Sequence, residues 1–483
     1  MKLLLDTNIL IPLEPSGEPA VNTDAATLLS RLVHEGGHSL YVHPDVGIDV
    51  GRDRDRSRAE KFQRSLAKYP RLPNPPSIPR ALANQIGDAP VGSNDWVDNR
   101  LLAALAADSV HLLVSEDTGV LAKARRLGLI DRVLPLAEVV ALLGRAPLVP
   151  LPAVRSVAAH NLDSSDPIFE SFRSDYPGFD DWLRKCKLEH RQAWRIDTAN
   201  GAIAAFCIIK DEGEAAPLLG DAPTKICSFK VDSTYNGRKY GELLLRAIFE
   251  RCYSEGRSGI YITVFPKYSA LIALLCDFGF VTRNEPATAS EQEQWLSKRL
   301  VPPKEDTTRG LDFHIKYGPP RFDASVPWHV VPIRPEYSDV LFPETAGNPS
   351  LFEGLHPFGN AVRKAYLCNS PSRRIAAGDV LAFYRTANAQ GLIALGVVEK
   401  TLVSQEVGII VTAVARRTVY TFREIQKLCQ RPVLAILFRQ ALVVRPFRRS
   451  VDLVLGGVFD RPPQSIMQAR AKGLNWLREQ FRV

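Results

Sequence analysis

Apolar and polar residues follow three different patterns along the chain. Residues 1–146 show short apolar strands separated by segments of helical periodicity, which is typical of an α/β/α parallel sheet. Residues 156–318 combine strands with amphipathic helices, and residues 328–483 consist mainly of short strands. A chain of 483 residues is too long for one ordinary domain, since about 100 to 200 residues per domain gives about three. We therefore predict a multidomain protein of α/β and α+β class.

The same pattern predicts the individual elements. Proline-rich runs, which neither helices nor inner strands tolerate, place linkers at 147–155 and 319–327. The predicted helices are 24–34, 96–107, 179–190, 242–253, 291–300 and 421–429. The predicted strands are 2–5, 39–42, 110–115, 192–196, 203–209, 226–231, 260–265, 328–333, 379–385, 393–399, 408–415 and 435–445.

A turn between the strand 226–231 and the helix 242–253 is a candidate binding site for a phosphate group. Its amides and the positive end of the helix dipole converge on one spot, where they can hold a pyrophosphate. Arg238 and Lys239 add cationic character that suits phosphate. The candidate cofactor-binding residues are Val231, Asn236, Gly237, Arg238, Lys239, Tyr240 and Gly241.

The turn YNGRKYGELLL, the strand YITVFP and the helix that ends in DFGF together resemble the GNAT family of acyl-CoA-dependent N-acyltransferases. In that family the turn has the sequence motif Arg/Gln-x-x-Gly-x-Gly/Ala, whereas this chain has Asn236, Lys239 and Gly241 at the three positions that the motif specifies. The resemblance implies a GNAT mixed sheet with helices that binds acetyl-CoA, and a catalytic Tyr268 that protonates the leaving thiolate. The alternatives are a buried tyrosine bonded to a neighbour and a fold that has lost its reaction.

Four aspartates of the first 146 residues arrive at strand ends and helix starts. Such a cluster is opposed by like-charge repulsion unless it holds a divalent ion, and oxygen ligands favour magnesium or manganese. A metal site of this kind can activate water for phosphodiester hydrolysis. The four candidate ligands and catalytic residues are Asp6, Asp49, Asp98 and Asp117.

The segments LLLDTNIL, HPDVGIDV, DWVDNRLLAAL and LLVSEDTGVLAKARRLGL resemble a PIN domain, the nuclease fold of many toxin-antitoxin toxins. The resemblance implies a Mg- or Mn-dependent endoribonuclease, with Asp49 at a position where glutamate is usual. The resemblance is also compatible with a homodimer and with an antitoxin-type partner protein. The alternative is a PIN fold that serves only for docking.

Positive charge is concentrated in the last third of the chain. The net charge is +8, and residues 321–483 hold 22 Lys+Arg against 12 Asp+Glu. This surplus favours a polyanionic partner, and nucleic acid is the first candidate. The alternative is a solvated basic surface that has no partner.

The run RRIAAGDVLAFYRTANAQGLIALGVVEK in the same part resembles the PUA-like superfamily, which includes the ASCH and EVE groups. The resemblance implies that residues 328–483 form a β-barrel that binds RNA, plausibly tRNA. For each aromatic residue, the alternative is ordinary barrel core. The candidate RNA-binding residues are Arg373, Arg374, Arg416, Arg417 and Tyr384.

Together these patterns predict a ribonuclease, an acetyl-CoA-dependent N-acetyltransferase and an RNA-binding domain on one chain, in a toxin or defence-type effector. The alternatives are a protein or small-molecule N-acetyltransferase whose other domains only bind partners, and a non-catalytic acyl-CoA-sensing regulator that binds nucleic acid. Seven dispersed cysteines and the lack of an apolar run of about 18 residues predict a cytoplasmic protein that does not enter a membrane.

Overall fold

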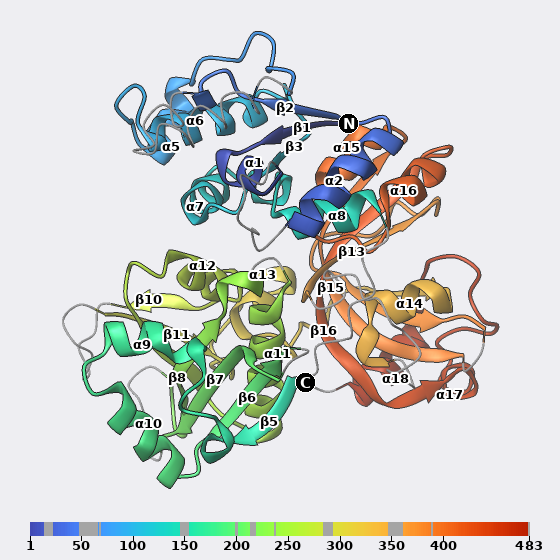
Figure 1. Cartoon of the computed structure of the whole chain (residues 1–483). Coiled ribbons are helices and arrows are strands. Elements are labelled where there is room, and N and C mark those ends of the chain that lie inside the picture. The colour runs from blue at the N-terminus through green and yellow to red at the C-terminus, as the bar shows by residue number, and fades with distance from the viewer. Residues whose placement is uncertain are drawn as a thin grey trace. The chain divides into compact units, whose positions relative to one another are not determined.

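The chain forms two compact units that are not contiguous in sequence (Figure 1). Met1–Pro147 and Leu402–Ala435 make the first unit, and Leu148–Thr401 and Ile436–Val483 make the second unit. The predicted domain 328–483 is therefore divided between the two. The computed structural model describes residues 1–13, 23–47, 66, 69–144, 154–198, 201–212, 219–235, 238–283, 293–345, 361–387 and 390–481, without the side chains of 11–13 and 23–26.

A four-stranded parallel sheet in the order β2-β1-β3-β4 organises the first unit. The side chains of Leu3, Leu4 and Leu5 are all buried, as parallel strands covered on both faces require. The parallel sheet predicted for this part of the chain is present. Its elements are β1 (Lys2–Leu5), α1 (Thr7–Leu13), α2 (Thr23–Glu35), β2 (Ser39–Val42), α5 (Arg80–Ile86), α6 (Asn94–Ala106), β3 (Leu112–Val114), α7 (Thr118–Arg126), β4 (Val133–Leu134) and α8 (Leu136–Leu143).

Two helices from late in the sequence, α15 (Val407–Val414) and α16 (Phe422–Leu428), complete the first unit. The prediction of a strand at 408–415 was wrong, because a short apolar run does not distinguish a strand from a buried helix. In α15 the buried residues Ile410, Val411 and Val414 lie on one helical face.

The second unit contains a seven-stranded sheet in the order β10-β11-β9-β8-β7-β6-β5. Its neighbours pair antiparallel except for β8 and β9. One face packs against α9 and α10 around Phe169 and Phe206, and the other packs against α11 and α12 around Phe249 and Phe278. Its elements are β5 (Val154–Ala158), α9 (Glu170–Asp175), α10 (Phe179–Leu188), β6 (Gln192–Asp197), β7 (Ile203–Asp211), β8 (Thr224–Val231), α11 (Tyr240–Ser254), β9 (Gly259–Val264), α12 (Ser269–Asp277), β10 (Val281–Arg283), β11 (Gln294–Arg299) and α13 (Gly310–Tyr317).

The strand β11 replaces the helix predicted at 291–300. Its neighbour β9 pairs with all six residues of β11, and the adjacent side chains of Trp295 and Leu296 are both buried. Since a strand directs successive side chains to opposite faces, a sheet covered on both faces buries both of them.

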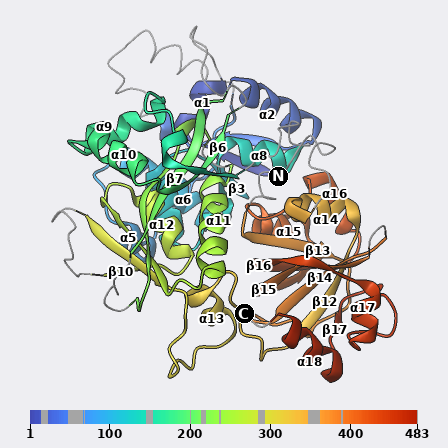
Figure 2. The same ribbon diagram turned by 90° about the horizontal axis from the view of Figure 1, so that it is seen from below.

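The second unit also holds a six-stranded sheet in the order β13-β16-β15-β14-β12-β17, whose strands lie side by side in Figure 2. Among the described strands, β13 and β17 are the ends of this order, so the pairings do not include the closure that the predicted barrel requires. Its elements are β12 (Trp328–Ile333), α14 (Pro335–Leu341), β13 (Arg363–Cys368), β14 (Val380–Arg385), β15 (Gly391–Ser404), β16 (Val433–Arg449), α17 (Ser450–Leu455), β17 (Met467–Gln468) and α18 (Ala471–Gln480).

We expect replacement of Arg416 to destabilise the first unit. Arg416 Nε donates to Glu138 Oε2 at 3.0 Å, and the Glu138 side chain is fully buried. Because Arg416→Met strands that carboxylate without its cation, the free energy of unfolding should fall by about 3 kcal/mol in a urea titration. Arg423→Met on the exposed face of α16 is the control, and equal stabilities of the two variants would contradict the prediction.

Candidate functional site

The parallel strands β8 and β9 separate in the middle of the seven-stranded sheet. Within the described chain they pair only at Thr224–Ile260, Lys225–Tyr261 and Ile226–Ile262. Beyond this point β8 stays paired with β7 as far as Val231, and β9 stays paired with β11 as far as Val264. The facing backbone edges of β8 and β9 are therefore not bonded to each other along this stretch, which we call the split.

A β-bulge in β8 lies where the split begins. Ile209 pairs with Ile226 and Ile208 pairs with Ser228, so Cys227 is the extra residue. A bulge bends its strand and increases the local twist. The bend therefore accounts for the divergence of β8 from β9 after Ile226.

The predicted phosphate-binding turn follows the split and precedes α11. Lys239 occupies the N-cap with a φ of +61°, and the guanidinium of Arg238 lies 4.9 Å from the centre of the Tyr235 ring. A Cβ at Gly241 would lie 2.9 Å from Leu274 Cδ2 and 3.8 Å from Val231 Cγ2, so the helix start packs closely against α12 and touches the end of β8. The structure thus brings Arg238, Lys239, Tyr240 and Gly241 to one helix N-terminus near Val231, while Asn236 and Gly237 lie outside the described residues.

Tyr268 lies directly before α12, at the same end of the sheet as the split. Its hydroxyl donates to the carboxylate of Asp175, which also pairs with the ammonium of Lys267. Next to Asp175, the Tyr176 hydroxyl donates to Glu293 Oε1 at 2.7 Å. Burial and the neighbouring Glu293 raise the pKa of Tyr176 well above its usual range. No motif marks Asp175, Tyr176 or Glu293, because only the tertiary fold joins α9 to the segment before β11.

The first two turns of α11 contact the region of the six-stranded sheet in the same unit. Glu242 Oε2 accepts from the Val362 amide at 2.8 Å, and Arg246 Nη1 donates to Glu344 Oε1 at 3.0 Å. The ammonium of Lys364 is buried nearby and donates to the Leu341 carbonyl, and burial lowers its pKa to about 7. The helix that presents the turn is therefore fixed by buried polar contacts as well as by apolar packing.

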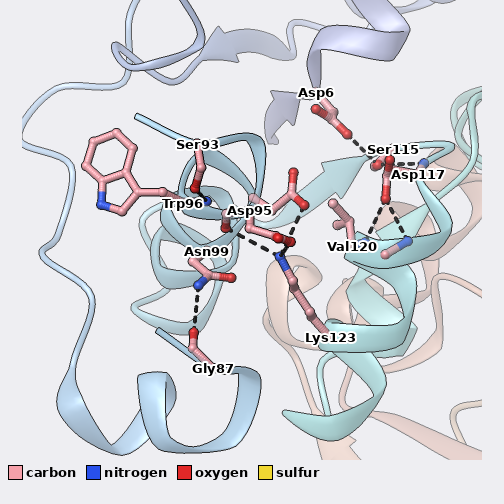
Figure 3. Close-up of polar contacts among 12 residues, drawn as sticks. Asp6, Gly87, Ser93, Asp95, Trp96, Asn99, Ser115, Asp117, Val120 and Lys123 are labelled. Carbon is pink, nitrogen blue, oxygen red and sulfur yellow. Dashed lines mark hydrogen bonds and ion pairs between the residues drawn. The ribbon is translucent and has the colours of Figure 1, made fainter. Parts of the chain in front are cut away.

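Two of the four predicted metal ligands, Asp6 and Asp117, are joined through Ser115 in the first unit (Figure 3), and Asp98 is near enough to Asp6 to repel its charge. Ser115 Oγ donates to Asp6 Oδ2 at 2.6 Å and accepts from the Asp117 amide at 3.1 Å. Asp117 Oδ1 caps α7 by accepting from the Gly119 and Val120 amides at 2.6 and 3.0 Å. Asp49 lies outside the described residues.

Burial and neighbouring carboxylates act together on this group. Burial, with repulsion from Asp98 and Asp117, raises the pKa of Asp6 to about 7, and burial raises the pKa of Asp98 to about 6. The ammonium of Lys123 lies 2.7 Å from Asp95 Oδ1 and 3.2 Å from Asp98 Oδ2, so it already supplies a cation there. In the described part of the chain, no three His, Cys, Asp or Glu residues converge as a metal site.

We expect the pH dependence of stability to reveal the buried carboxyl of Asp6. Its pKa is raised from 3.8 to about 7 on folding, so protonation favours the folded state. That stabilisation is complete below pH 4 and is lost as the pH rises to about 7, which corresponds to about 4 kcal/mol. Asp6→Asn should therefore flatten the decline in unfolding free energy between pH 4 and pH 7, measured with urea in EDTA.

The exposed Asp88 provides the control, since Asp88→Asn should keep the wild-type pH profile. A profile for Asp6→Asn that declines as steeply as the wild type would rule out this assignment.

The predicted RNA-binding residues belong to both units and have different surroundings. Arg416 and Arg417 pair with Glu138 and Asp131, which does not suit a role in binding phosphates. The Tyr384 ring is fully buried and its hydroxyl contacts Ser450 Oγ at 3.0 Å, so it is core rather than a stacking platform. Arg373 and Arg374 are exposed, and Arg373 donates to two backbone carbonyls.

Residues 157–280 match the acetyltransferase (GNAT) family. The chain therefore carries an acetyltransferase domain, which includes α9 to α12 and the split between β8 and β9. The family match covers neither the first unit nor the six-stranded sheet, so the PIN resemblance remains a prediction. No curated protein matches the chain.

Three of the solved structures similar to this chain each cover about a third of it. ASCH from Zymomonas mobilis is 15% identical, with 32% of this chain and 94% of that chain covered and a TM-score of 0.24. A GNAT-family acetyltransferase from Staphylococcus aureus is 15% identical, with 31% and 100% covered and a TM-score of 0.25. PaiA N-acetyltransferase from Thermoplasma acidophilum, solved with coenzyme A, is 12% identical, with 30% and 99% covered and a TM-score of 0.24.

No helix among the described residues has the length and apolar character that are needed to cross a bilayer.

Proposed function

We propose that the chain is an acetyl-CoA-dependent N-acetyltransferase. The observation that carries the proposal is the split between β8 and β9, which ends next to the N-terminus of α11. Amides at a helix N-terminus bind phosphate, and the exposed backbone edges of separated strands can bond the amides of a pantetheine chain. Arg238 and Lys239 would hold the pyrophosphate, and Gly241 lets the start of α11 pack closely against Leu274 of α12.

The reaction needs an unprotonated amine and a proton for the leaving sulfur. Acetyl-CoA supplies the activated acetyl group. The amine nitrogen attacks the thioester carbonyl carbon, a C–N bond forms, the C–S bond breaks, and the nitrogen releases a proton. Tyr268 would give its proton to the departing thiolate and regain one from solvent, with Asp175 holding its ring in place.

We expect Tyr268→Phe to lower kcat by roughly 100-fold, because general acid catalysis contributes about that much, while KM for acetyl-CoA stays within about twofold. The measurement is steady-state release of free thiol with an amine acceptor across a pH range. Tyr261→Phe, whose hydroxyl donates to Glu212 at 3.2 Å, is the matched control. An unchanged kcat and pH profile in Tyr268→Phe would assign Tyr268 a structural role only.

A second candidate function is metal-dependent RNA cleavage by the first unit. It is favoured by one observation: Asp6 and Asp117 are bridged by Ser115 at the carboxyl ends of β1 and β3. Asp6, Asp98 and Asp117 would bind Mg or Mn, and Asp49 would be the fourth ligand. These oxygens suit such ions, but Lys123 would first have to release Asp98.

We expect purified protein with manganese to cleave total bacterial RNA, and Asp6→Asn to abolish the cleavage on a gel, since loss of a metal ligand removes the activated water. Asp88→Asn serves again as the control. If the wild type left the RNA intact, the first unit would not be a ribonuclease, and a role in docking would remain.

We also propose partners, a location and a biological role for the chain. An RNA partner such as tRNA would use the exposed Arg373 and Arg374. A homodimer, an antitoxin-type partner and a toxin or defence role follow from the resemblances alone, and a cytoplasmic location follows from the cysteine usage and the apolar-run lengths. The competing proposals remain an acetyltransferase whose other parts only bind partners, and a regulator that binds acyl-CoA without turnover.

A further inference from the structure

The face of the seven-stranded sheet opposite α11 carries polar side chains beside the split. Ser228 pairs with Ile208, which packs against α10, so Ser228 points to that face. Lys225 lies over the ring of Tyr261, and that ring contacts Trp295 edge-on at 5.5 Å. The bulge adds one residue between Lys225 and Ser228, so both side chains lie on the same face although they are three residues apart. Strands β8 and β11 therefore present Ser228 and Trp295 to the same side of the sheet.

Two of these groups are buried without a hydrogen-bond partner. Trp295 is 6% exposed and Ser228 is 5% exposed, and neither Trp295 Nε1 nor Ser228 Oγ has a partner among the described residues. Nearly all buried polar groups in proteins are bonded, so these two groups call for a partner that the described residues do not supply, such as a ligand or a water. An indole N–H only donates, so the missing partner of Trp295 is an acceptor such as a carbonyl oxygen.

Negative charge lies beside these groups. Glu293 precedes Trp295 by two residues, which places both on the same face. Tyr176 bonds Glu293, and its ring lies 5.1 Å from Phe265, which follows β9. Asp175 adjoins Tyr176 and contacts both Tyr268 and Lys267. Among the described residues, the two carboxylates contact one cation, Lys267, so a cationic ligand would complete the charge balance.

We propose that this face binds the acetyl acceptor, and that the acceptor is an aminoacyl group with a primary amine next to a carbonyl oxygen. Trp295 Nε1 donates to the carbonyl, and Glu293 attracts the ammonium and takes its proton before attack. Tyr176 positions Glu293, and Ser228 contributes a second polar contact. This inference rests on the proposed acetyl transfer.

The test compares two small amines that differ in the carbonyl group. Alaninamide carries an amine next to a carbonyl, and isopropylamine has the same branched amine without it. We expect the wild type to prefer alaninamide in kcat/KM, compared per unprotonated amine. Trp295→Phe should reduce this preference by about tenfold, the effect of one lost hydrogen bond. Glu293→Gln should raise KM for both amines.

Trp182→Phe on α10 is the matched control and should keep the wild-type preference. Acetyl-CoA binding by calorimetry is measured for every variant, to show that the domain is folded. Equal use of the two amines by the wild type, an unchanged preference in Trp295→Phe, or acetyl-CoA binding with neither amine acetylated would overturn the inference. Absence of acetyl-CoA binding by the wild type would instead overturn the proposed function.

Discussion

The separation of β8 from β9 is the constraint on which the account of the second unit depends. Two parallel strands at the centre of a sheet normally bond along their whole length, since unpaired buried backbone groups are costly. Here the described pairing stops after Ile226 and Ile262, at the bulge formed by Cys227. One place in the fold is then surrounded by the unpaired edges, the N-terminus of α11 and the tyrosines after α9 and β9.

The helix α11 connects this place to the rest of the second unit. One end of it presents the turn with Arg238 and Lys239, and its first two turns contact Val362 and Glu344. Val362 also belongs to the apolar core formed by α11, α12 and the seven-stranded sheet. The six-stranded sheet region therefore contributes directly to the environment of the acetyltransferase helices, although the family match ends at residue 280.

Local patterns predicted the elements around the split, because strand and helix periods in β8, α11, β9 and α12 are clear and each follows a turn. The local patterns failed where contacts between residues far apart in the sequence determine the structure. The run 408–415 became a helix in another unit, and the arginines thought to bind RNA meet acids 278 and 286 residues away in sequence. Asp175, Tyr176 and Glu293 had no motif, since they meet only after the fold forms.

Hydrogen–deuterium exchange of the full chain, with and without acetyl-CoA, tests the split most directly. The account predicts that acetyl-CoA slows exchange of the amides in residues 227–231 and 238–243, while the six-stranded sheet strand β14 is unchanged. Without acetyl-CoA, residues 227–231 should exchange faster than 224–226, which are bonded on both sides. Equal protection along β8 and no response to acetyl-CoA would contradict it.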